Sequence, residues 1–548
     1  MELFYVFARY MEKNTLQNIG RVYRQHQKML SLVFLVLLLL VSAILRLYNI
    51  AGYMTFLGDE GRDVLVVKRI LVDHKLTLLG PTASVGGFFM GPIYYYFMLP
   101  FLWLWRLDPV GPAIMVALFG VATVYMVYRI GRDFFDEETG YFAAGLYALS
   151  PLVIAYSRSS WNPNLVPFFS AFLLYTLLQI GVKYRWKWTL WAGVILGIGL
   201  QLHYLFLFLF PVVAFWICRS LRDKIIPSVV LGIGGFIIGY APFLAFELRH
   251  GFPNTVSIWQ FLASGKDTGF SIVQFLGTLS DVIFRVFGRL LLRIPDPGVL
   301  ANLPAWQIAA WVWSVRLAII AVVAILLSQF VSSGWLEKTR VGRWFASWKE
   351  NRANVRTGLL LLSAWFAIVL FLFGLYKRAI YDYYFGILFV LPFLLLGYVL
   401  ARLWRYPKTK YIALGLWGLL LLFNWQGRPF RYAPNQQLAQ TKRIAQEAYA
   451  QTEGKPFNFA LITGNNSDHA YRYFFEIWDN APVTIENTTV DPDRHTVTDQ
   501  LIVICETPDC RPLGHPLWEI AGFGRAQIVG RWEVPFVEIY KLIHYKGE

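Results

Sequence analysis

The chain has 548 residues, of which 57% are hydrophobic, 17% are aromatic and only 15% are charged. This balance excludes most soluble classes and indicates a multi-pass membrane protein. The formal net charge of +16 does not predict a nucleic-acid partner, because Lys and Arg in a chain with long apolar runs more often mark cytoplasmic loops. Three cysteines exclude a disulfide framework, and only Cys505 and Cys510 are close enough in sequence to form a pair, if their domain faces an oxidising compartment.

The first apolar run, Leu30 to Leu45, follows a basic stretch and ends without a small-residue cleavage site. We therefore expect it to remain as a signal anchor that follows a cytoplasmic segment at residues 1–29. The run Pro92 to Trp105 is of borderline length, and a crossing there would put the following basic loops on the wrong side. It is predicted to be an interfacial helix on the outer surface, within an external first loop at residues 46–109.

The later apolar runs predict further spans, because their lengths fit the thickness of the bilayer. The Lys and Arg content of the loops between them indicates which loops are cytoplasmic. The run at residues 188–218 is too long for one untilted span and has basic flanks, which favours two short spans with an outer turn near His203. A long external segment is expected before Ala305, and a basic inner loop after Val331. In total, about 11 transmembrane helices are expected over residues 30–425. The other spans are predicted at residues 110–127, 141–156, 165–182, 226–246, 306–331, 359–375, 384–400 and 411–423.

Residues 426–548 have a different, more polar composition. The runs "FNFALIT", "DQLIVIC" and "FVEIYKLI" indicate strands, and "NQQLAQTKRIAQEAYAQ" indicates a helix. The segment has no Gly-rich phosphate loop, and its histidines, His469, His495 and His515, lack a metal-ligand spacing. We interpret it as a lid or interaction domain. The predicted fold class is thus a polytopic α-helical membrane protein with a C-terminal extracytoplasmic α/β domain.

The stretch "GDEGRD" places two adjacent carboxylates, Asp59 and Glu60, at the start of the external first loop. One interpretation is structural: Asp59 caps the following helix, and loop carboxylates are usually solvated. The other is catalytic: a partly desolvated carboxylate at the membrane surface accepts the proton of an attacking hydroxyl. A base of this kind needs cations nearby to hold the leaving group.

Several basic and tyrosyl residues are predicted at outer span ends. Each has a structural explanation, since an arginine can snorkel, a histidine can cap a turn and tyrosines can form an aromatic belt. Together they suit an anionic lipid phosphate, so we expect the basic members to converge at one outer pocket despite their distance in sequence. The candidates are Arg158, His203, Tyr204, Lys377, Arg378, Tyr381, Tyr383 and Tyr384.

The order of these features resembles a known superfamily. The acid pair after the first span is followed by an external amphipathic segment, a cytoplasmic "RIGRDFFDEETG" turn and "ALSPLVIAYSR". From about Leu30 to Leu400, the chain resembles the integral-membrane glycosyltransferases of the GT-C superfamily. Within the superfamily it is most similar to the protein O-mannosyltransferase and lipid A aminoarabinose transferase group, also called family 39-like.

The resemblance implies that Asp59 is the catalytic base, with Glu60 as its neighbour. It also implies a donor sugar on a polyprenyl phosphate, whose phosphate is held by the basic and tyrosyl groups at outer span ends. Many members carry a second acid where this chain has "SSWNPN", so Asn162 or Asn164 stands in its place. A divalent metal held between two acids is therefore an alternative that the sequence does not favour, and we assign no cofactor. The acceptor is an unspecified lipid, glycan or protein.

Two other functions remain as alternatives. A lipid-linked glycan flippase or transporter would predict charged residues within spans and repeat symmetry, and the sequence shows little of either. An O-antigen polymerase or ligase usually has a large external loop late in the chain, whereas the acid pair lies early here. For the transferase we expect the cytoplasmic (inner) membrane, with the active site on the extracytoplasmic side.

Overall fold

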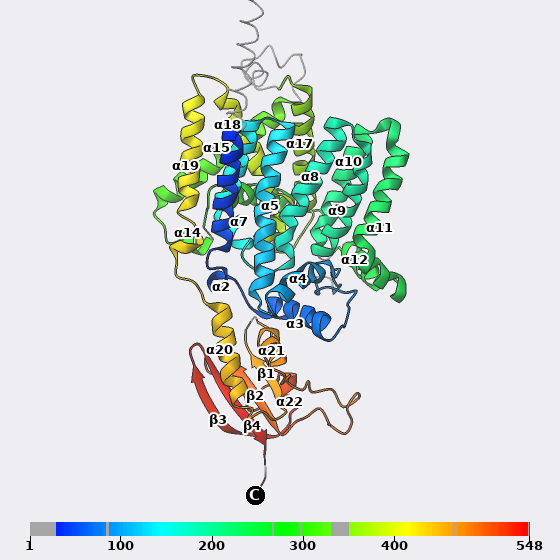
Figure 1. Ribbon diagram of the computed structural model, residues 1–548, viewed down its shortest axis with the longest axis vertical. Coiled ribbons are helices and arrows are strands. Elements are labelled where there is room, and N and C mark those ends of the chain that lie inside the picture. The colour runs from blue at the N-terminus through cyan, green and yellow to red at the C-terminus, as the bar shows by residue number, and fades with distance from the viewer. Residues whose placement is uncertain are drawn as a thin grey trace, which may run out of the picture.

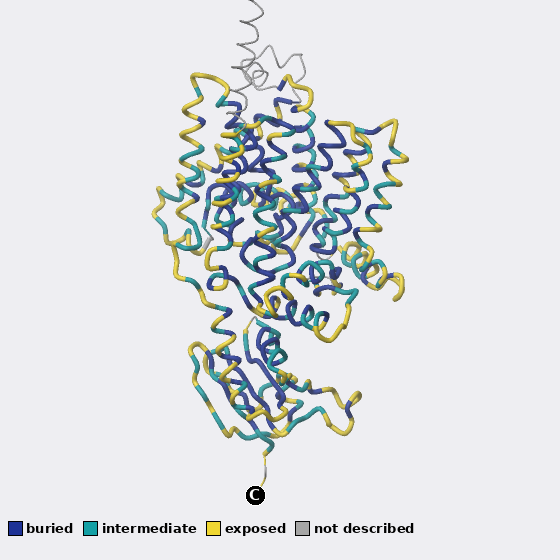
Figure 2. The backbone as a smooth tube through the Cα atoms, in the orientation of Figure 1, coloured by how far each residue is buried: buried dark blue, intermediate teal, exposed yellow. Residues whose placement is uncertain are grey.

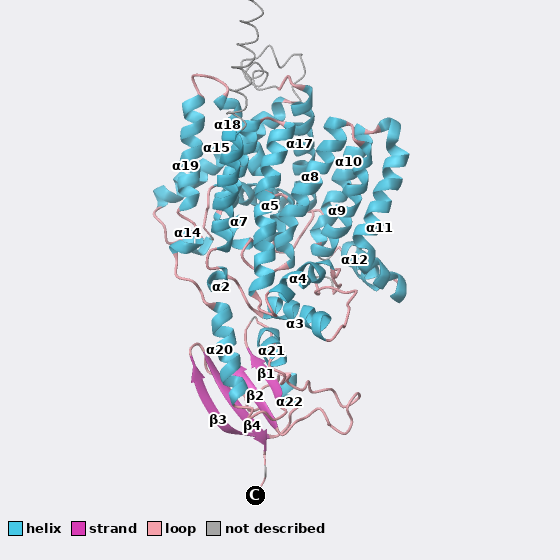
Figure 3. Ribbon diagram, in the orientation of Figure 1, coloured by secondary structure: helices cyan, strands magenta, loops and turns pink. Residues whose placement is uncertain are grey.

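The computed structural model of the protein describes residues 29–83, 87–265, 268–295, 297–329, 350–464 and 466–545, together with Gly547. Helices form an elongated bundle, and a small sheet lies beyond one end of it (Figure 1; Figure 3). The predicted cytoplasmic segment 1–29 lies almost entirely outside the described residues. The same holds for most of the predicted basic loop after Val331.

Six helices in the described part of the chain are long and apolar enough to cross a membrane, judged by length and composition. Shorter apolar helices accompany them, and the total of about 11 spans stays a prediction. The six are Met29–Leu47, α5 (Val110–Phe134), η1 with α8 (Asn162–Lys183), η4 with α11 (Arg222–His250), α15 (Ala305–Ser328) and α17 (Ala353–Gly374). The shorter ones are α4 (Ile93–Leu104), η3 with α10 (Tyr204–Ser220), α18 (Val390–Trp404) and α19 (Lys410–Trp425).

Two of the predicted spans are built from shorter helical pieces. The run at residues 141–156 forms α6 (Glu137–Leu149) and α7 (Pro151–Tyr156), because proline cannot occupy a helix interior without loss of a hydrogen bond, but fits the first turn of a new helix. The run at residues 188–218 forms α9 (Thr189–Leu202) and α10 (Leu209–Ser220), with His203 and the 3₁₀ turn η3 (Tyr204–Phe208) between them.

A seam of small residues brings α9 close to α11 (Ile225–His250). A Cβ atom on Gly193 would lie 1.9 Å from the carbonyl oxygen of Gly232, and one on Gly239 would lie 2.2 Å from that of Val194. Only glycine allows the two backbones to approach this closely. Small residues at such crossings are typical of helix pairs in membranes.

Three helices near the first loop lie at the end of the bundle that faces the sheet (Figure 1). They are α2 (Ile50–Tyr53), α3 (Gly58–Val72) and α4. With 12 residues, α4 is about 18 Å long at 1.5 Å per residue, well short of the roughly 30 Å hydrocarbon core. It packs on α3, α5 and α9, so its place at this end is set by neighbouring helices.

The segment between α11 and α15 was expected to be external, and it contains α12 (Pro253–Ala263), α13 (Ile272–Leu291) and α14 (Pro297–Leu300). The long helix α13 packs its apolar face against α15, α17 and α18. Its charged side chains Asp281 and Arg285 stay partly exposed and pair with one another. The segment is thus joined to the bundle along an amphipathic helix.

The C-terminal part forms a four-stranded sheet of order β1-β2-β4-β3. Strands β1 (Asn458–Ile462) and β2 (Gln500–Cys505) are parallel, while β3 (Ala526–Val534) and β4 (Val537–His544) are antiparallel. Because side chains alternate along a strand, one set on β1 and β2 packs with α20 (Gln437–Ala450) and α21 (His469–Ile477), and the other packs with α22 (Trp518–Ala521).

The apolar core of the sheet and its helices continues into the bundle. Phe56, just before α3, contacts the rings of Tyr473 and Phe474 on α21, and these residues belong to the same buried cluster as the bundle interior. Figure 2 shows the buried residues along the bundle and within the C-terminal unit. The helical bundle and the small α/β unit, which together make up the predicted fold class, are confirmed.

A disulfide joins Cys505, at the end of β2, to Cys510. This settles the pairing that the sequence left open. The third cysteine, Cys218, is a free and exposed thiol near the end of α10.

Candidate functional site

The acid pair lies in the first turn of α3, and its two members have different surroundings. The backbone N–H of Leu57 donates to Glu60 Oε2 at 3.0 Å, so Glu60 satisfies one of the free amides at the helix N-terminus. Asp59 caps nothing: its side chain is 56% exposed and accepts from Arg62 Nη1 at 2.9 Å. The structural interpretation of the pair therefore applies to Glu60, while Asp59 remains open to a ligand.

Arg62 is held between two carboxylates. It donates to Asp63 Oδ1 at 2.8 Å, and the Asp63 side chain is fully buried. Tyr95 donates to the same oxygen at 3.3 Å, while Oδ2 of Asp63 has no hydrogen-bond partner among the described residues. Burial raises the pKa of Asp63 to about 6, although Arg62 opposes this shift. Burial also raises the pKa of Glu60 to about 7.

A cavity of about 170 Å³ opens beside Asp59 and Arg62. Residues distant in sequence meet here, from α3, the first loop, η1 (Asn162–Leu165), the His203 turn and η6 (Asp382–Ile387). Polar and aromatic groups thus face a carboxylate and a cation in one small space. The other lining residues are Pro81, Thr82, Ala83, Met90, Trp161, Asn162, Pro163, His203, Tyr204 and Tyr383.

The predicted aromatic residues cluster at this cavity. The His203 and Tyr204 rings stack with centroids 4.6 Å apart, and the His203 ring lies 5.3 Å from that of Tyr384. Tyr383 contacts both Tyr384, at 4.7 Å, and Tyr381, at 5.8 Å. Of these five residues, His203, Tyr204 and Tyr383 line the cavity, and the other two pack behind them.

Arg158 has a different place from the one predicted. Its Nη1 donates to the carbonyl of Leu45 at 2.8 Å, its Nη2 donates to that of Tyr48 at 2.7 Å, and its guanidinium lies over the Tyr53 ring. The side chain is buried and does not line the cavity. It satisfies carbonyls at the C-terminal end of the first helix, which is a common role for arginine.

The prediction that four basic residues converge at one pocket is therefore wrong for three of the four. Lys377 Nζ donates to the carbonyl of Gly265 at 3.0 Å, and neither Lys377 nor Arg378 lines the cavity. Among Arg158, His203, Lys377 and Arg378, only His203 does. The position of a residue at a span end fixes its depth, but the local packing of the turn or loop that carries it decides which way its side chain faces.

Sequence reasoning missed Arg62 and Asp63. A signal was available for Arg62, because residues three apart on a helix are neighbours, and Arg62 follows Asp59 by three positions. Asp63 could not be identified, since its burial depends on α4 and on Tyr95.

Asn162 lines the cavity where many relatives were expected to carry an acid. Its Nδ2 donates to the carbonyl of Leu202 at 2.6 Å, next to His203, whereas Asn164 donates to the Ser159 carbonyl at 2.9 Å. In the described part of the chain, no three His, Cys, Asp or Glu residues are grouped so that they could hold a metal ion.

The C-terminal unit contacts α3 at the acid pair itself. The backbone N–H of Gly58 donates to Asn466 Oδ1 at 2.9 Å. A Cβ atom on Gly61 would lie 2.3 Å from the backbone nitrogen of Ala470 on α21, so glycine is required for this approach. Farther along α3, Arg69 pairs with Glu476. The two glycines of "GDEG" thus bring α21 against the first turns of α3.

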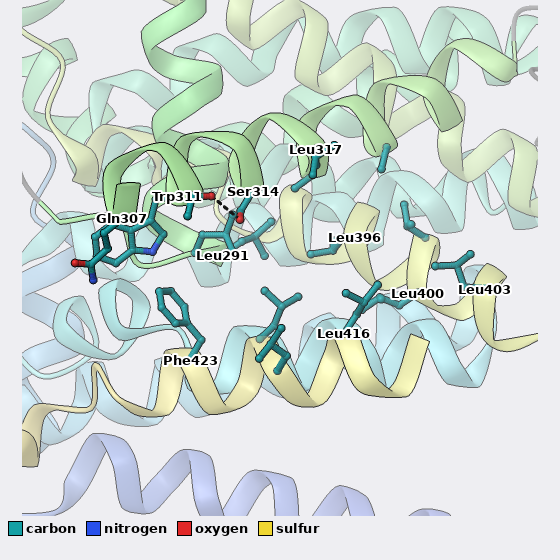
Figure 4. A pocket seen from close by; sticks show the side chains of 17 residues that line it. Leu291, Gln307, Trp311, Ser314, Leu317, Leu396, Leu400, Leu403, Leu416 and Phe423 are labelled. Carbon is teal, nitrogen blue, oxygen red and sulfur yellow. Dashed lines mark hydrogen bonds between the residues drawn. The ribbon is translucent and has the colours of Figure 1, made fainter. Parts of the chain in front are cut away.

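A larger cavity, of about 610 Å³, lies elsewhere, between α15, α18 and α19 (Figure 4). Most of its lining is leucine, alanine, valine and aromatic side chains, and the hydroxyl of Ser314 is already bound to the Ala310 carbonyl at 2.8 Å. It shares no lining residue with the Asp59 cavity. Among the described residues the lining holds no acid or base, and its one hydroxyl is already bonded within α15, so the cavity suits hydrocarbon.

Residues 91–246 match a family model described as "Dolichyl-phosphate-mannose-protein mannosyltransferase". The matched segment runs from the start of α4 to α11 and includes Asn162, His203 and Tyr204. The resemblance to GT-C glycosyltransferases that the sequence indicated is thereby confirmed. No curated protein sequence matches the chain significantly.

Two solved structures are similar over most of the chain. ArnT from Cupriavidus metallidurans bound to undecaprenyl phosphate is 12% identical, with a TM-score of 0.47 over 93% of this chain and 97% of its own. The Archaeoglobus fulgidus oligosaccharyltransferase in complex with Zn and sulfate is 14% identical, with a TM-score of 0.46 over 86% of this chain and 67% of its own.

Proposed function

We propose that the protein is a membrane glycosyltransferase that moves a sugar from a polyprenyl-phosphate donor to an acceptor hydroxyl, with Asp59 as general base. The observation that carries this proposal is the cavity in which a half-exposed carboxylate lies beside one arginine and opposite His203, Tyr204 and Tyr383. The family match over residues 91–246 supports the same class of reaction.

In the proposed reaction, the acceptor hydroxyl attacks the anomeric carbon of the donor sugar. Its proton passes to Asp59 as the new C–O bond forms, and the bond between the anomeric carbon and the phosphate oxygen breaks, with its electron pair staying on the phosphate. Arg62 remains cationic between Asp59 and Asp63, and we assign it the task of keeping Asp59 ionised and aligned.

The leaving phosphate needs hydrogen-bond donors and positive charge in the cavity. We assign the donor role to the hydroxyls of Tyr204 and Tyr383 and the imidazole of His203, and the positive charge to Arg62, which lies beside Asp59. Tyr381 and Tyr384 then position these rings. Arg158 supports the first helix instead, and Lys377 supports the loop at Gly265.

The extracytoplasmic side is proposed for the cavity and the C-terminal unit. Both lie at the same end of the bundle, because Asn466 binds Gly58 directly. The Cys505–Cys510 disulfide supports an oxidising compartment at this end. Predicted inner loops meet at the opposite end, where Asp136 pairs with Arg352 and Arg405. A multi-pass protein of the cytoplasmic membrane, with domain limits near residues 30–425 and 426–548, fits these observations.

The activity is tested with the purified protein in detergent and a panel of radiolabelled polyprenyl-phosphate sugars. We expect release of label from one carrier, either to an added acceptor extract or slowly to water. A flippase would leave every donor intact, and an O-antigen polymerase or ligase would require a diphosphate-linked oligosaccharide. Either result would replace the proposed function.

The sidedness is tested by cysteine labelling in a Cys218→Ser background, since the other two cysteines are disulfide-bonded. Lys455→Cys, on the exposed surface of the C-terminal unit, should react with an impermeant maleimide in intact cells. Lys408→Cys, in the exposed turn between α18 and α19, should react only after permeabilisation. The reverse pattern would invert the proposed topology.

A further inference from the structure

A second polar cavity, of about 390 Å³, lies in the C-terminal unit where it meets α3. Thr463 follows β1, Glu506 follows β2, and both line the cavity. The cavity therefore lies at the carboxyl ends of two parallel strands, which is where ligands bind in open α/β sheets. None of its lining residues takes part in the reaction assigned to Asp59.

One wall of this cavity is a fixed set of polar groups around Glu506. Its carboxylate accepts from Thr463 Oγ1 at 2.8 Å, from Tyr471 Oη at 2.7 Å and from Asn466 Nδ2 at 3.1 Å. Among the described residues, no lysine or arginine lines the cavity. A wall of this kind offers acceptors and amides to hydroxyl groups and repels a second anion.

Other residues that line the cavity supply amides and an aromatic ring. Gln437 and Gln440 project from α20, and Phe536 stands in the β3–β4 turn with 85% of its surface exposed. Phe536 adopts a φ of 74°, a left-handed conformation that costs a non-glycine residue of the order of 1 kcal/mol. A sugar matches this pairing, because its hydroxyls bind amides and carboxylates while its C–H face packs on an aromatic ring.

The cavity also adjoins the catalytic helix. Leu57, two positions before Asp59, lines it. Gln437 Oε1 accepts from the backbone N–H of Phe56 at 3.0 Å, and Asn466 Oδ1 accepts from that of Gly58 at 2.9 Å. A chain of sugars held here would extend toward the first turn of α3.

We propose that this cavity binds the acceptor as a neutral or amino saccharide and directs one hydroxyl toward Asp59. The acceptor role rests on the proposed function, whereas saccharide binding by the cavity does not. Of the three acceptor classes that the sequence left open, the cavity selects a glycan. Uronic acids and phosphorylated sugars should bind poorly, because Glu506 repels anions and the described lining holds no lysine or arginine.

The test applies full-length protein in detergent to a printed array of defined saccharides that carry neutral, amino and uronic acid sugars. We expect binding to neutral or amino members only. Phe536→Ala and Gln440→Ala should each weaken it at least about tenfold, because each removes a ligand contact. Neither Phe536 nor Gln440 donates to Glu506, so the folded network stays intact.

Matched control variants keep the chemistry of each change and move it away from the cavity. Gln446→Ala lies on the exposed face of the same helix α20, and Tyr545→Ala removes a partly exposed ring beyond β4. Both should bind like wild type. The proposal is overturned if no saccharide binds, if only acidic saccharides bind, or if the control variants lose as much saccharide affinity as the cavity variants. Saccharide binding without any donor turnover would contradict the proposed transferase function but still support the saccharide-binding site.

Discussion

The two ends of the helical bundle both carry carboxylates next to arginines, but they differ in how fully these charges are compensated. At the end away from the sheet, Asp136 accepts from Arg352, Arg405 and the backbone N–H of Thr139. Glu350 accepts from Arg352 and Tyr398. Burial alone would raise the pKa of Glu350, but these hydrogen bonds lower it to about 2.

At the sheet end, the charges are only partly compensated. Asp59 has one partner and is more than half exposed, and Asp63 keeps one oxygen without a hydrogen bond among the described residues. Burial raises the pKa of both Glu60 and Asp63. Fully paired charges hold loops together, while exposed or strained charges beside a cavity are typical of functional sites. The two ends therefore differ in charge compensation, and the partly compensated end is the one for which catalysis is proposed.

The largest effect that would separate the two ends comes from neutralising one carboxylate at each. Asp59→Asn keeps the size of the side chain but cannot accept a proton, so transfer from the labelled donor should fall at least about 100-fold. Asp136→Asn, at the opposite end, should lower the thermal midpoint and leave turnover per folded molecule near wild type. Equal turnover in Asp59→Asn and wild type would show that Asp59 is not the catalytic base.

The next effect concerns the docking of α21 on α3. Gly61→Ala would place a Cβ atom 2.3 Å from the Ala470 nitrogen, and overpacking of this kind costs about 1–3 kcal/mol. We expect a lower thermal midpoint and faster proteolysis between the bundle and the C-terminal unit. Gly234→Ala, where a Cβ would meet nothing within 4 Å, is the matched helix control and should be tolerated. An unchanged midpoint in Gly61→Ala would mean that the contact is not tight.

A smaller effect is expected from Asp63, which positions Arg62 without facing the cavity. Asp63→Asn removes the charge that holds the guanidinium, so kcat should fall about tenfold, or about 1.4 kcal/mol, with KM little changed. Tyr95→Phe removes only the 3.3 Å hydrogen bond to the same oxygen and should cost less than Asp63→Asn. The assignment of Asp63 fails if kcat stays at the wild-type value in Asp63→Asn.

The smallest effect is a change in the pH dependence of stability. The folded protein keeps the Glu60 proton up to about pH 7, whereas an ordinary glutamate releases it near 4.5. Between these values the unfolded chain binds fewer protons, so stability falls as pH rises. Glu60→Gln should flatten this decline by a few degrees in thermal midpoint measured from pH 4.5 to 7.5. A decline as steep as in wild type would exclude Glu60 as its source.

Much of the sheet end of the bundle was predictable from local sequence. Asp59, His203, Tyr204 and Tyr383 were all placed at this end from span lengths and basic loops, and the structure brings them to one cavity. The same reasoning placed Arg158 and Lys377 at this end, but their side chains face Leu45 and Gly265. The C-terminal cavity was not predictable at all, because Asn466 reaches Gly58 across 408 positions.

The difference between the residues that were placed correctly and those that were not has one physical cause. The order of apolar and polar residues sets the depth of each helix, because a bilayer of roughly 30 Å penalises any polar backbone or charge left in its core. It therefore also sets which end of the bundle each loop occupies. Depth says nothing about rotation around the helix axis, which depends on which side chains interlock with neighbouring helices. Tertiary packing alone thus turned Arg158 toward the first helix, buried Asp63 under α4 and placed α21 against Gly61.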